Sequence, residues 1–235
     1  MDIKLLSIII PVFNEESTLE KLISSIESVH LTYEKELIFI DDGSTDRSRE
    51  VLEKFKHRYK ILSQPRNKGK GSAIRLGFAE AIGDVILVQD ADLEYSPQEY
   101  KSLVQPIIDG LADVVYGSRF VTVFPRRVLY FWHYVANTGL TLLSNILTGL
   151  NLSDMETGYK VFTRQALKEI LPCLQSQRFG IEPELTAQIA KHKFRVYEIG
   201  ISYHGRTYEE GKKIGWKDGV AAIWHIVKFN IFTKK

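Results

Sequence analysis

Short apolar runs alternate with amphipathic segments through the first half of the chain. The runs cover residues 6–10, 36–40, 60–62 and 85–88. A polar turn follows each of them, and apolar residues at helical spacing come next, as in the segment 19–26. This alternation predicts right-handed β–α–β units and a parallel sheet. We therefore expect an α/β fold with a mostly parallel sheet flanked by helices.

The polar turns carry most of the candidate chemistry. They occupy residues 11–17, 41–46, 66–71 and 90–94. Because the carboxyl ends of parallel strands meet at one edge of a sheet, and ligands bind there in open α/β folds, these turns are expected to form one site.

Paired carboxylates stand directly after the fourth apolar run. Asp90 and Asp92 are separated by one residue, and Glu94 lies two positions further on. Hard oxygen ligands at this spacing suit Mg²⁺ or Mn²⁺ that is shared with substrate phosphates. Acidic pairs at strand ends also occur as solvated turns, so the spacing alone leaves both interpretations open.

Composition limits the remaining possibilities. A chain of 235 residues with 44% hydrophobic residues is most simply one globular domain, residues 1–235, with a nucleotide-binding half at about 1–120 and an acceptor half at about 121–235. A net charge of +2 argues against bulk nucleic-acid binding. The single Cys173 excludes an intrachain disulfide and fits a reducing compartment, and no signal peptide is recognised, so we expect a cytoplasmic location.

The second half contains a long uncharged stretch. Residues 128–153 carry no Asp, Glu, Lys or Arg. Polar residues recur every three or four positions and form a stripe, with apolar residues away from it: His133, Asn137, Thr141, Ser144, Asn145 and Thr148 against Trp132, Val135, Leu142, Leu143 and Ile146. This pattern predicts an amphipathic helix that packs on the sheet or lies in a membrane interface; a spanning helix is a third reading. Residues 214–232 have a similar pattern, with lysines nearby that anionic lipid would attract.

The ordered set of motifs resembles the nucleotide-diphosphosugar glycosyltransferases of family 2, which have the GT-A fold. The resemblance is carried by residues 9–15, 40–46, 67–71, 90–94, 117–120 and 155–160. It is closer to the branch that acts on dolichyl or undecaprenyl phosphate. It implies a transferase that uses a nucleotide-diphosphate sugar, a polyprenyl phosphate and a divalent metal.

The resemblance also assigns roles around the donor. Pro11, Phe13, Glu15 and Asp42 would surround the nucleoside, with Lys70 near the nucleotide. Asp42 could instead serve helix capping around residues 43–46, and residues 67–71 could be a plain helix-entry turn. The metal ligands would be Asp92 and Glu94. Asp90 would lie nearer the ribose, and Ala91 belongs to the same binding set.

Basic residues of the second half would hold phosphate. Arg119 looks like the family's phosphate-binding arginine, and Arg206 and Lys212 resemble a loop that closes over the diphosphate. An exposed charged loop is the alternative for the last two. Arg126 and Arg127 fit either a phosphate role or a solvated face.

The implied reaction is an inverting transfer in which Asp92, Asp90 and Arg119 carry the catalysis. A lipid phosphate is already an anion, so it needs no strong general base. A neutral hydroxyl acceptor would need one, with Glu156 or Glu182 as candidates.

Glu94 favours glucose from UDP-glucose, and GDP-mannose is the alternative donor. A non-catalytic nucleotide-sugar-binding protein is the alternative of another class. The expected location is peripheral, on the cytoplasmic face of a membrane, where a membrane protein is a candidate partner.

Overall fold

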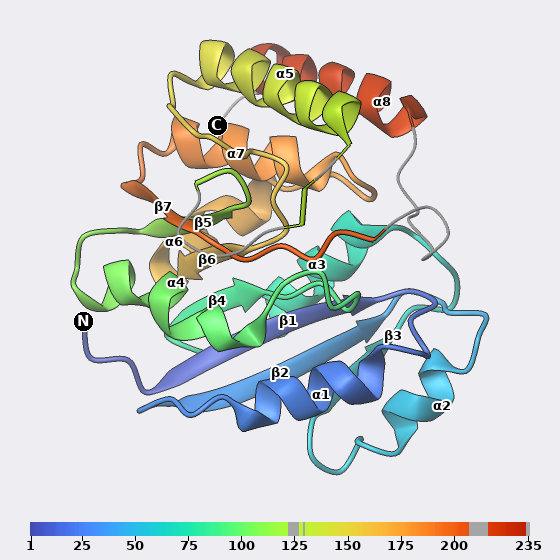
Figure 1. Ribbon diagram of the computed structural model, residues 1–235. Helices are drawn as coiled ribbons and strands as arrows, with labels where there is room; N and C mark the ends of the chain where they lie inside the picture. The colour runs from blue at the N-terminus through green and yellow to red at the C-terminus, as the bar shows by residue number, and fades with distance from the viewer. Residues whose placement is uncertain (122–126, 129, 207–215, 234–235) are drawn as a thin grey trace.

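The computed structural model describes residues 1–121, 127–128, 130–206 and 216–233, and for residues 216–218 it describes the backbone alone. These residues contain a seven-stranded sheet in the order β3-β2-β1-β4-β6-β5-β7 (Figure 1). The strands are β1 Leu5–Val12, β2 Glu34–Asp41, β3 Lys60–Ser63, β4 Val85–Val88, β5 Val114–Ser118, β6 Lys160–Thr163 and β7 Val196–Gly200. All neighbours pair in parallel except β6, which is antiparallel to both β4 and β5. The predicted α/β fold is confirmed.

The central strands are apolar on both faces because both faces of the sheet are covered. Along β1, Ile8 and Ile10 belong to one core while Ile9 belongs to the other. The first core is closed by α1 Leu19–Ser28, α2 Ser48–Glu53 and α4 Tyr100–Ile108. The second is closed by α3 Lys70–Glu80, α6 Arg164–Ile170 and α7 Ile181–Lys191. Continuous apolar runs are the pattern expected of parallel strands buried in this way.

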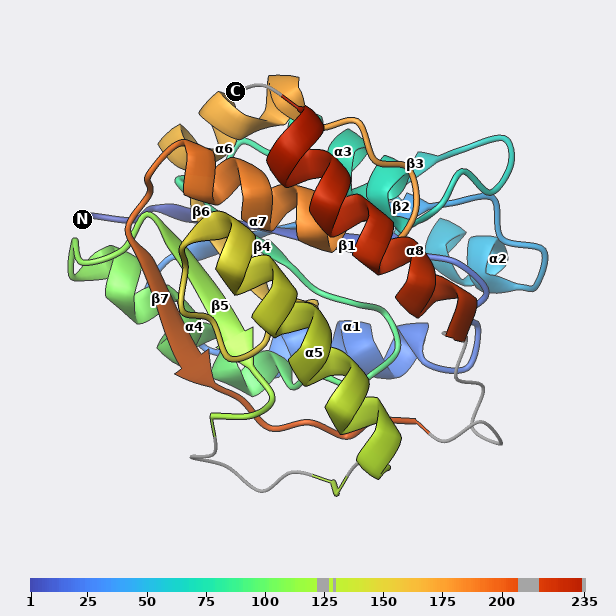
Figure 2. The ribbon, with the colours of Figure 1, turned by 90° about the horizontal axis from the view of Figure 1, so that it is seen from above.

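Two further helices form an outer layer. These are α5 Phe131–Thr148 and α8 Trp216–Val227, which continues into a π-helical turn, Lys228–Phe232. Both helices pack on α7 and on each other, and the view from above shows them in front of the sheet (Figure 2). Of the alternatives for the uncharged stretch, packing inside the protein is therefore observed, with α7 and α8 as its main partners in place of the strands. None of the described helices has the length and apolar character needed to cross a membrane.

The strand register brings the polar turns together. Val12 pairs with Asp41, and Ile9 pairs with Val88, so β1, β2 and β4 end at the same edge. Beyond these pairs, the Asp42 N–H donates to Val12 O and the Gln89 N–H donates to Ile9 O. This edge holds the site.

Candidate active site

An arginine from the second half of the chain joins the nucleotide-binding turns. The Arg206 guanidinium lies 2.7 Å from Glu15 Oε2 and donates to the backbone O of Asp92, also at 2.7 Å. Its backbone N–H donates to Glu94 Oε1 at 2.8 Å, and the Tyr203 hydroxyl donates to Glu94 Oε2 at 2.9 Å. The side chain of Arg206 is only 18% exposed. The alternative of an exposed loop is therefore wrong for this residue, whereas Lys212 lies outside the described residues.

The carboxylate of Asp42 is held by the turn that precedes α3. Backbone N–H groups of Lys68 and Gly69 donate to its two oxygens at 2.8 and 2.7 Å. Burial raises the pKa of Asp42, although these N–H groups act in the opposite direction. Asp42 thus orders the helix-entry turn of α3, not the turn at residues 43–46. A carboxylate has about four acceptor positions, so Asp42 can accept further hydrogen bonds beside those from Lys68 and Gly69. Its contact with a nucleoside stays a prediction.

The glycines of that turn let the backbone approach another part of the chain. Gly69 has φ 100°, and a side chain there would meet the backbone of Gln177 and Arg178. Gly71 approaches the same segment, and the Ser72 N–H donates to Gln177 O. These glycines therefore let the helix-entry turn lie directly against residues 176–178, and the position of Lys70 near a nucleotide stays a prediction.

Lys70 lies at the centre of a buried charge network. Its Nζ is 2.8 Å from Asp90 Oδ1 and 3.2 Å from Glu182 Oε1. Lys160, which is 1% exposed, contacts the other oxygen of Glu182 at 2.5 Å. Burial alone would lower the pKa of Lys70, but Asp90 and Glu182 raise it above its ordinary value. Lys70 therefore stays charged and ties the end of β4 to α7.

The same network argues against Glu182 as a general base. Burial would raise the pKa of Glu182, but Lys160 and Lys70 outweigh burial and lower it. A carboxylate with a lowered pKa accepts a proton poorly. Lys160 ends one of the segments that carry the family resemblance, but the sequence predicts no role for it, because its pairing with Glu182 joins residues of separate elements.

Within the acidic turn, Asp92 lies in a buried and negatively charged environment. Burial raises its pKa to about 7, with further contributions from Asp90 and Glu94. The Glu94 N–H donates to Asp92 Oδ1 at 3.1 Å, and Leu93 between them adopts a left-handed φ of 62°. The described residues contain no group of three His, Cys, Asp or Glu side chains already arranged around a metal position.

The donor set of this turn nevertheless suits a divalent cation. Carboxylate oxygens are the ligands that Mg²⁺ and Mn²⁺ prefer. The repulsion from Asp90 and Glu94, which adds to the effect of burial on the pKa of Asp92, is the effect that a cation would relieve. Both oxygens of Glu94 already accept hydrogen bonds, from Tyr203 and Arg206, so Asp92 is the better placed ligand of the two.

Arg119 lies at the end of β5, where Asp154 holds it. Nε and Nη2 donate to the two Asp154 oxygens at 2.7 Å each, and the guanidinium stacks on Tyr203 at 5.3 Å. Burial would lower the pKa of Arg119, but Asp154 outweighs it and the pKa is raised. The fork is therefore charged and fixed in orientation, as recognition of a phosphate requires.

The segment 154–158 connects Arg119 with Asp90. Asp154 binds Arg119, and the Thr157 hydroxyl donates to Gly117 O. A Cβ on Gly158 would lie 2.2 Å from Asp90 Oδ2, so this glycine lets the segment touch the acidic turn. This contact could not be predicted from the sequence, because a glycine in a polar loop has many ordinary explanations.

The other predicted residues fall as follows. Pro11 and Phe13 are partly exposed at the end of β1, and Ala91 is buried between the carboxylates. Arg127 is exposed, and it donates through Nη1 to Gly205 O and through its backbone N–H to Tyr203 O. Arg126 lies outside the described residues.

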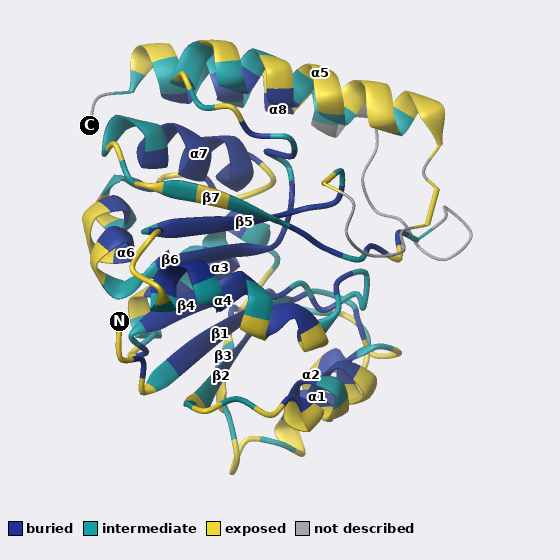
Figure 3. Ribbon diagram, turned by 60° about the vertical axis from the view of Figure 1, so that its left-hand side comes forward, coloured by how far each residue is buried: buried dark blue, intermediate teal, exposed yellow. Residues whose placement is uncertain are grey.

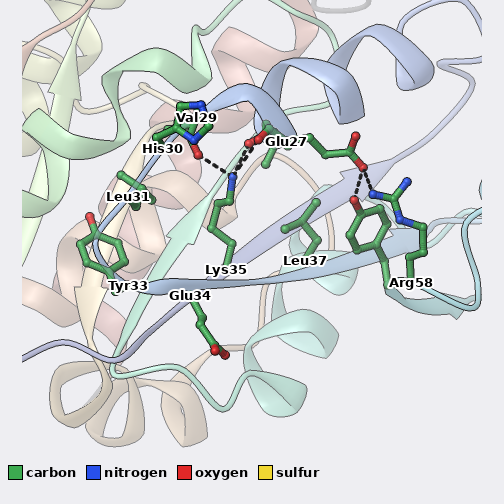
Figure 4. A pocket seen from close by; sticks show the side chains of 11 residues that line it. Glu27, Val29, His30, Leu31, Tyr33, Glu34, Lys35, Leu37 and Arg58 are labelled. Atoms are coloured by element: carbon green, nitrogen blue, oxygen red, sulfur yellow. Dashed lines mark hydrogen bonds and ion pairs between the residues drawn. The ribbon is translucent and has the colours of Figure 1, made fainter.

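A hollow elsewhere on the molecule has a structural explanation. It lies between the end of α1 and the start of β2 and is lined by Glu27, Tyr33, Lys35 and Arg58, among others (Figure 4). Lys35 Nζ donates to the carbonyls of Ile26 and Val29 and so caps the end of α1. None of the predicted site residues lines this hollow.

The chain is similar in sequence to known glycosyltransferases. Residues 7–171 match the sequence model of Glycosyl transferase family 2. A dolichyl-phosphate beta-glucosyltransferase of Trichomonas vaginalis is 30% identical over 84% of the chain, and a dolichol-phosphate mannosyltransferase of Pyrococcus furiosus is 29% identical over 88%. The chain spans 65% and 60% of the lengths of these two relatives.

The fold also matches solved structures. Glucosyl-3-phosphoglycerate synthase from Mycobacterium tuberculosis, in complex with Mn²⁺, UDP and phosphoglyceric acid, superposes with a TM-score of 0.74 at 19% identity. The superposition covers 96% of this chain and 77% of that one. The fold of that glycosyltransferase is the one that the motifs of this chain indicated.

Proposed function

Since the chain belongs to glycosyl transferase family 2, we propose that it transfers a hexose from a nucleotide-diphosphate sugar to a polyprenyl phosphate. The observation that carries the proposal is the meeting of Asp90, Asp92 and Glu94 with Arg206 and Arg119 at one sheet edge. Acidic residues on one side and fixed arginines on the other suit two phosphorylated substrates and a shared cation.

On the donor side, Asp92 and Glu94 would hold Mg²⁺ or Mn²⁺. Such an ion neutralises charge on a leaving diphosphate as a Lewis acid. Glu15 and Asp42 present acceptor oxygens to a nucleoside, and Arg206, which bridges Glu15 and the backbone of Asp92, lies where it can contact the diphosphate. Lys70 fixes the orientation of Asp90.

On the acceptor side, Arg119 draws the anionic phosphate toward the sugar. One phosphate oxygen attacks C1 as the bond from C1 to the diphosphate breaks, and the bonding electron pair leaves with the nucleoside diphosphate. The attack comes from the opposite face, so the configuration at C1 inverts. UDP-glucose is the donor we favour, and GDP-mannose is the alternative; the similarity to the Pyrococcus furiosus dolichol-phosphate mannosyltransferase supports mannose as the alternative sugar.

The outer helices support an acceptor that resides in a membrane. In α5 the polar stripe faces inward, with Thr141 3% and Ser144 1% exposed. The apolar face points outward, with Trp132 74% and Ile146 69% exposed, and α8 adds Trp224 at 58% (Figure 3). A helix with its apolar side toward the outside suits an interface with lipid. We propose that this outer face, made by the exposed apolar residues of α5 and α8, lies on the cytoplasmic side of a membrane.

The test is a donor panel with a defined acceptor. The purified full chain is incubated with UDP-glucose, GDP-mannose or other nucleotide sugars, a short prenyl phosphate and Mn²⁺ or Mg²⁺. We expect labelled sugar to move into an organic-solvent-soluble product with one donor, and EDTA to abolish the transfer. Transfer to water-soluble acceptors alone, or binding of nucleotide sugar without turnover, would contradict the proposal.

A further inference from the structure

Within the part of the chain that the structure describes, one carboxyl group near Arg119 lacks a cationic partner. Around it the cations are matched: Lys70 contacts Asp90, Lys160 contacts Glu182, and Arg119 contacts Asp154. Glu156 has no ion pair with any described residue, and its Oε1 is buried without a hydrogen-bond partner among them. A buried, unpaired acceptor atom is costly, so a native protein retains one where a ligand or a proton satisfies it.

The position of Glu156 connects it with the acceptor. It lies two residues after Asp154, which holds Arg119, and two residues before Gly158, which touches Asp90. Glu156 therefore lies on the segment that contacts both Arg119, the predicted phosphate-binding arginine, and the acidic turn. The carbonyls on both sides of it, of Met155 and Thr157, accept hydrogen bonds from buried Lys160, which fixes this segment.

Burial of the Glu156 carboxyl group favours its protonated form. Burial and Glu182 raise its pKa to about 7, against the opposing effects of Lys160 and Arg119, while Asp154 adds to the increase. A phosphate anion arriving beside Arg119 would add further negative charge and raise this pKa again. An ionised Glu156 would repel the acceptor, whereas a protonated one can donate a hydrogen bond to it.

We propose that Glu156 is a specificity-determining residue for the acceptor, holding a proton that it donates in a hydrogen bond to an oxygen of the bound phosphate. The proposal rests on the proposed function, since it requires a phosphate acceptor. During transfer the phosphate oxygen bonds to C1 and the diphosphate leaves with the electron pair. Glu156 keeps its proton throughout, so no co-reactant is needed. A neutral hydroxyl acceptor would need the opposite state, an ionised Glu156 acting as base.

A hydrogen-bond donor to phosphate and a general base for a hydroxyl acceptor would respond in opposite ways to the substitution Glu156→Gln. Glutamine keeps the shape of the side chain and an N–H donor but cannot act as a base. For the proposed role, Glu156→Gln keeps kcat/KM for a short prenyl phosphate within about fivefold of wild type at pH 6.5. The ratio of wild-type to variant kcat/KM then falls up to about tenfold per pH unit above the pKa of Glu156. Taking the ratio cancels the ionisation of the acceptor and of Asp92, which both enzymes share.

A binding measurement gives a second readout without turnover. Calorimetric titration with geranyl phosphate at pH 8, in two buffers of different ionisation enthalpy, should show more proton uptake by wild type than by Glu156→Gln. Glu169→Gln, an exposed position on α6, is the matched control and should behave as wild type. Thermal unfolding of all three proteins verifies folding.

The outcomes separate this inference from the proposed function. Activity of Glu156→Gln reduced by a hundredfold or more, a ratio that does not change with pH, or equal proton uptake would each overturn the role of Glu156 while transfer to prenyl phosphate remains. Absence of transfer to any prenyl phosphate by the wild-type protein would instead overturn the proposed function.

Discussion

The ammonium group of Lys70 and the carboxylate of Asp90 form a buried ion pair, 2.8 Å apart, at the start of α3 and the end of β4. Each side chain is less than one-fifth exposed, at 18% and 17%. Glu182 at the start of α7 shares the same ammonium group. The pair therefore links the acidic turn with a helix of the second half of the chain, and it fixes the carboxylate for which we propose a donor-side role.

Lys70→Met should be strongly destabilising. It leaves the Asp90 carboxylate without its Lys70 partner, while Glu182 keeps Lys160, and loss of one partner of a buried pair costs about 3–5 kcal/mol in comparable cases. The measurement is the free energy of unfolding in urea. Lys54→Met is the matched control, because Lys54 and Glu20 form a pair with both side chains more than half exposed. That variant should lose less than about 1 kcal/mol. Equal losses in the two variants would contradict a structural role for the Lys70 pair.

Gly158→Ala should damage catalysis more than stability. The added methyl group would overlap the Asp90 carboxylate and press on the Tyr95 ring, so Asp90 must move. A displacement of about 1 Å at a reacting site can cost about a hundredfold in rate. We expect a loss of that order in kcat/KM with the fold retained by circular dichroism. Gly139→Ala in α5 is the control, since no atom of the described residues, apart from the backbone of its own helix and its chain neighbours, lies within 4 Å of the new methyl group. Unchanged kinetics for Gly158→Ala would show that Asp90 need not occupy this position.

The fold could be predicted from the sequence because its signals are local. Runs such as residues 85–88 are continuous and apolar, and the structure has the strand β4 at that position. The strand ends then follow from parallel pairing, which is why Asp42 and Asp90 were expected at one edge.

The parts of the site that the sequence did not predict depend on contacts between residues far apart in the chain. Gly158 contacts Asp90, and Lys160 contacts Glu182, and no local sequence pattern predicts either contact. The strand β6 also inserts antiparallel between β4 and β5, which the alternation of strands and helices does not predict. In α5 the sequence showed two faces but not their directions, because an inward polar stripe reverses the usual arrangement in a water-soluble protein.

Metal affinity should depend on pH near neutrality. Asp92 has a pKa of about 7, and a cation binds only the ionised carboxylate, so protons compete with the metal. Affinity for Mn²⁺ should therefore rise with pH, by about tenfold between pH 6 and pH 8. Mn²⁺ titration followed by electron paramagnetic resonance measures this. Asp92→Asn should bind weakly at both pH values and lose at least about a hundredfold in turnover. Asp109→Asn, at an exposed position, should match wild type, and affinity independent of pH in the wild type would contradict the assignment of Asp92.

The outer face of α5 and α8 should bind anionic membranes. Trp132 and Trp224 are 74% and 58% exposed, so replacing both by serine removes apolar area from the surface without opening the core. We expect the free energy of unfolding to change by less than about 1 kcal/mol. Partition onto vesicles that contain anionic lipid should fall at least about tenfold, because each indole loses its transfer into the interface. Vesicle co-sedimentation measures this, and wild-type binding should weaken at high salt as the attraction to basic groups such as Arg127 is screened.

The control for this face is Ile82→Ser, which removes an exposed apolar side chain, 64% exposed, between α3 and β4. It lies outside the outer face, so vesicle binding should stay at the wild-type level. Equal binding by the Trp132→Ser/Trp224→Ser variant would refute membrane contact through α5 and α8. A wild-type dimer in gel filtration that this variant converts to a monomer would instead assign the face to self-association. Reduced vesicle binding together with reduced transfer to a long-chain prenyl phosphate, but not to a short one, would connect the face with delivery of the lipid acceptor to Arg119.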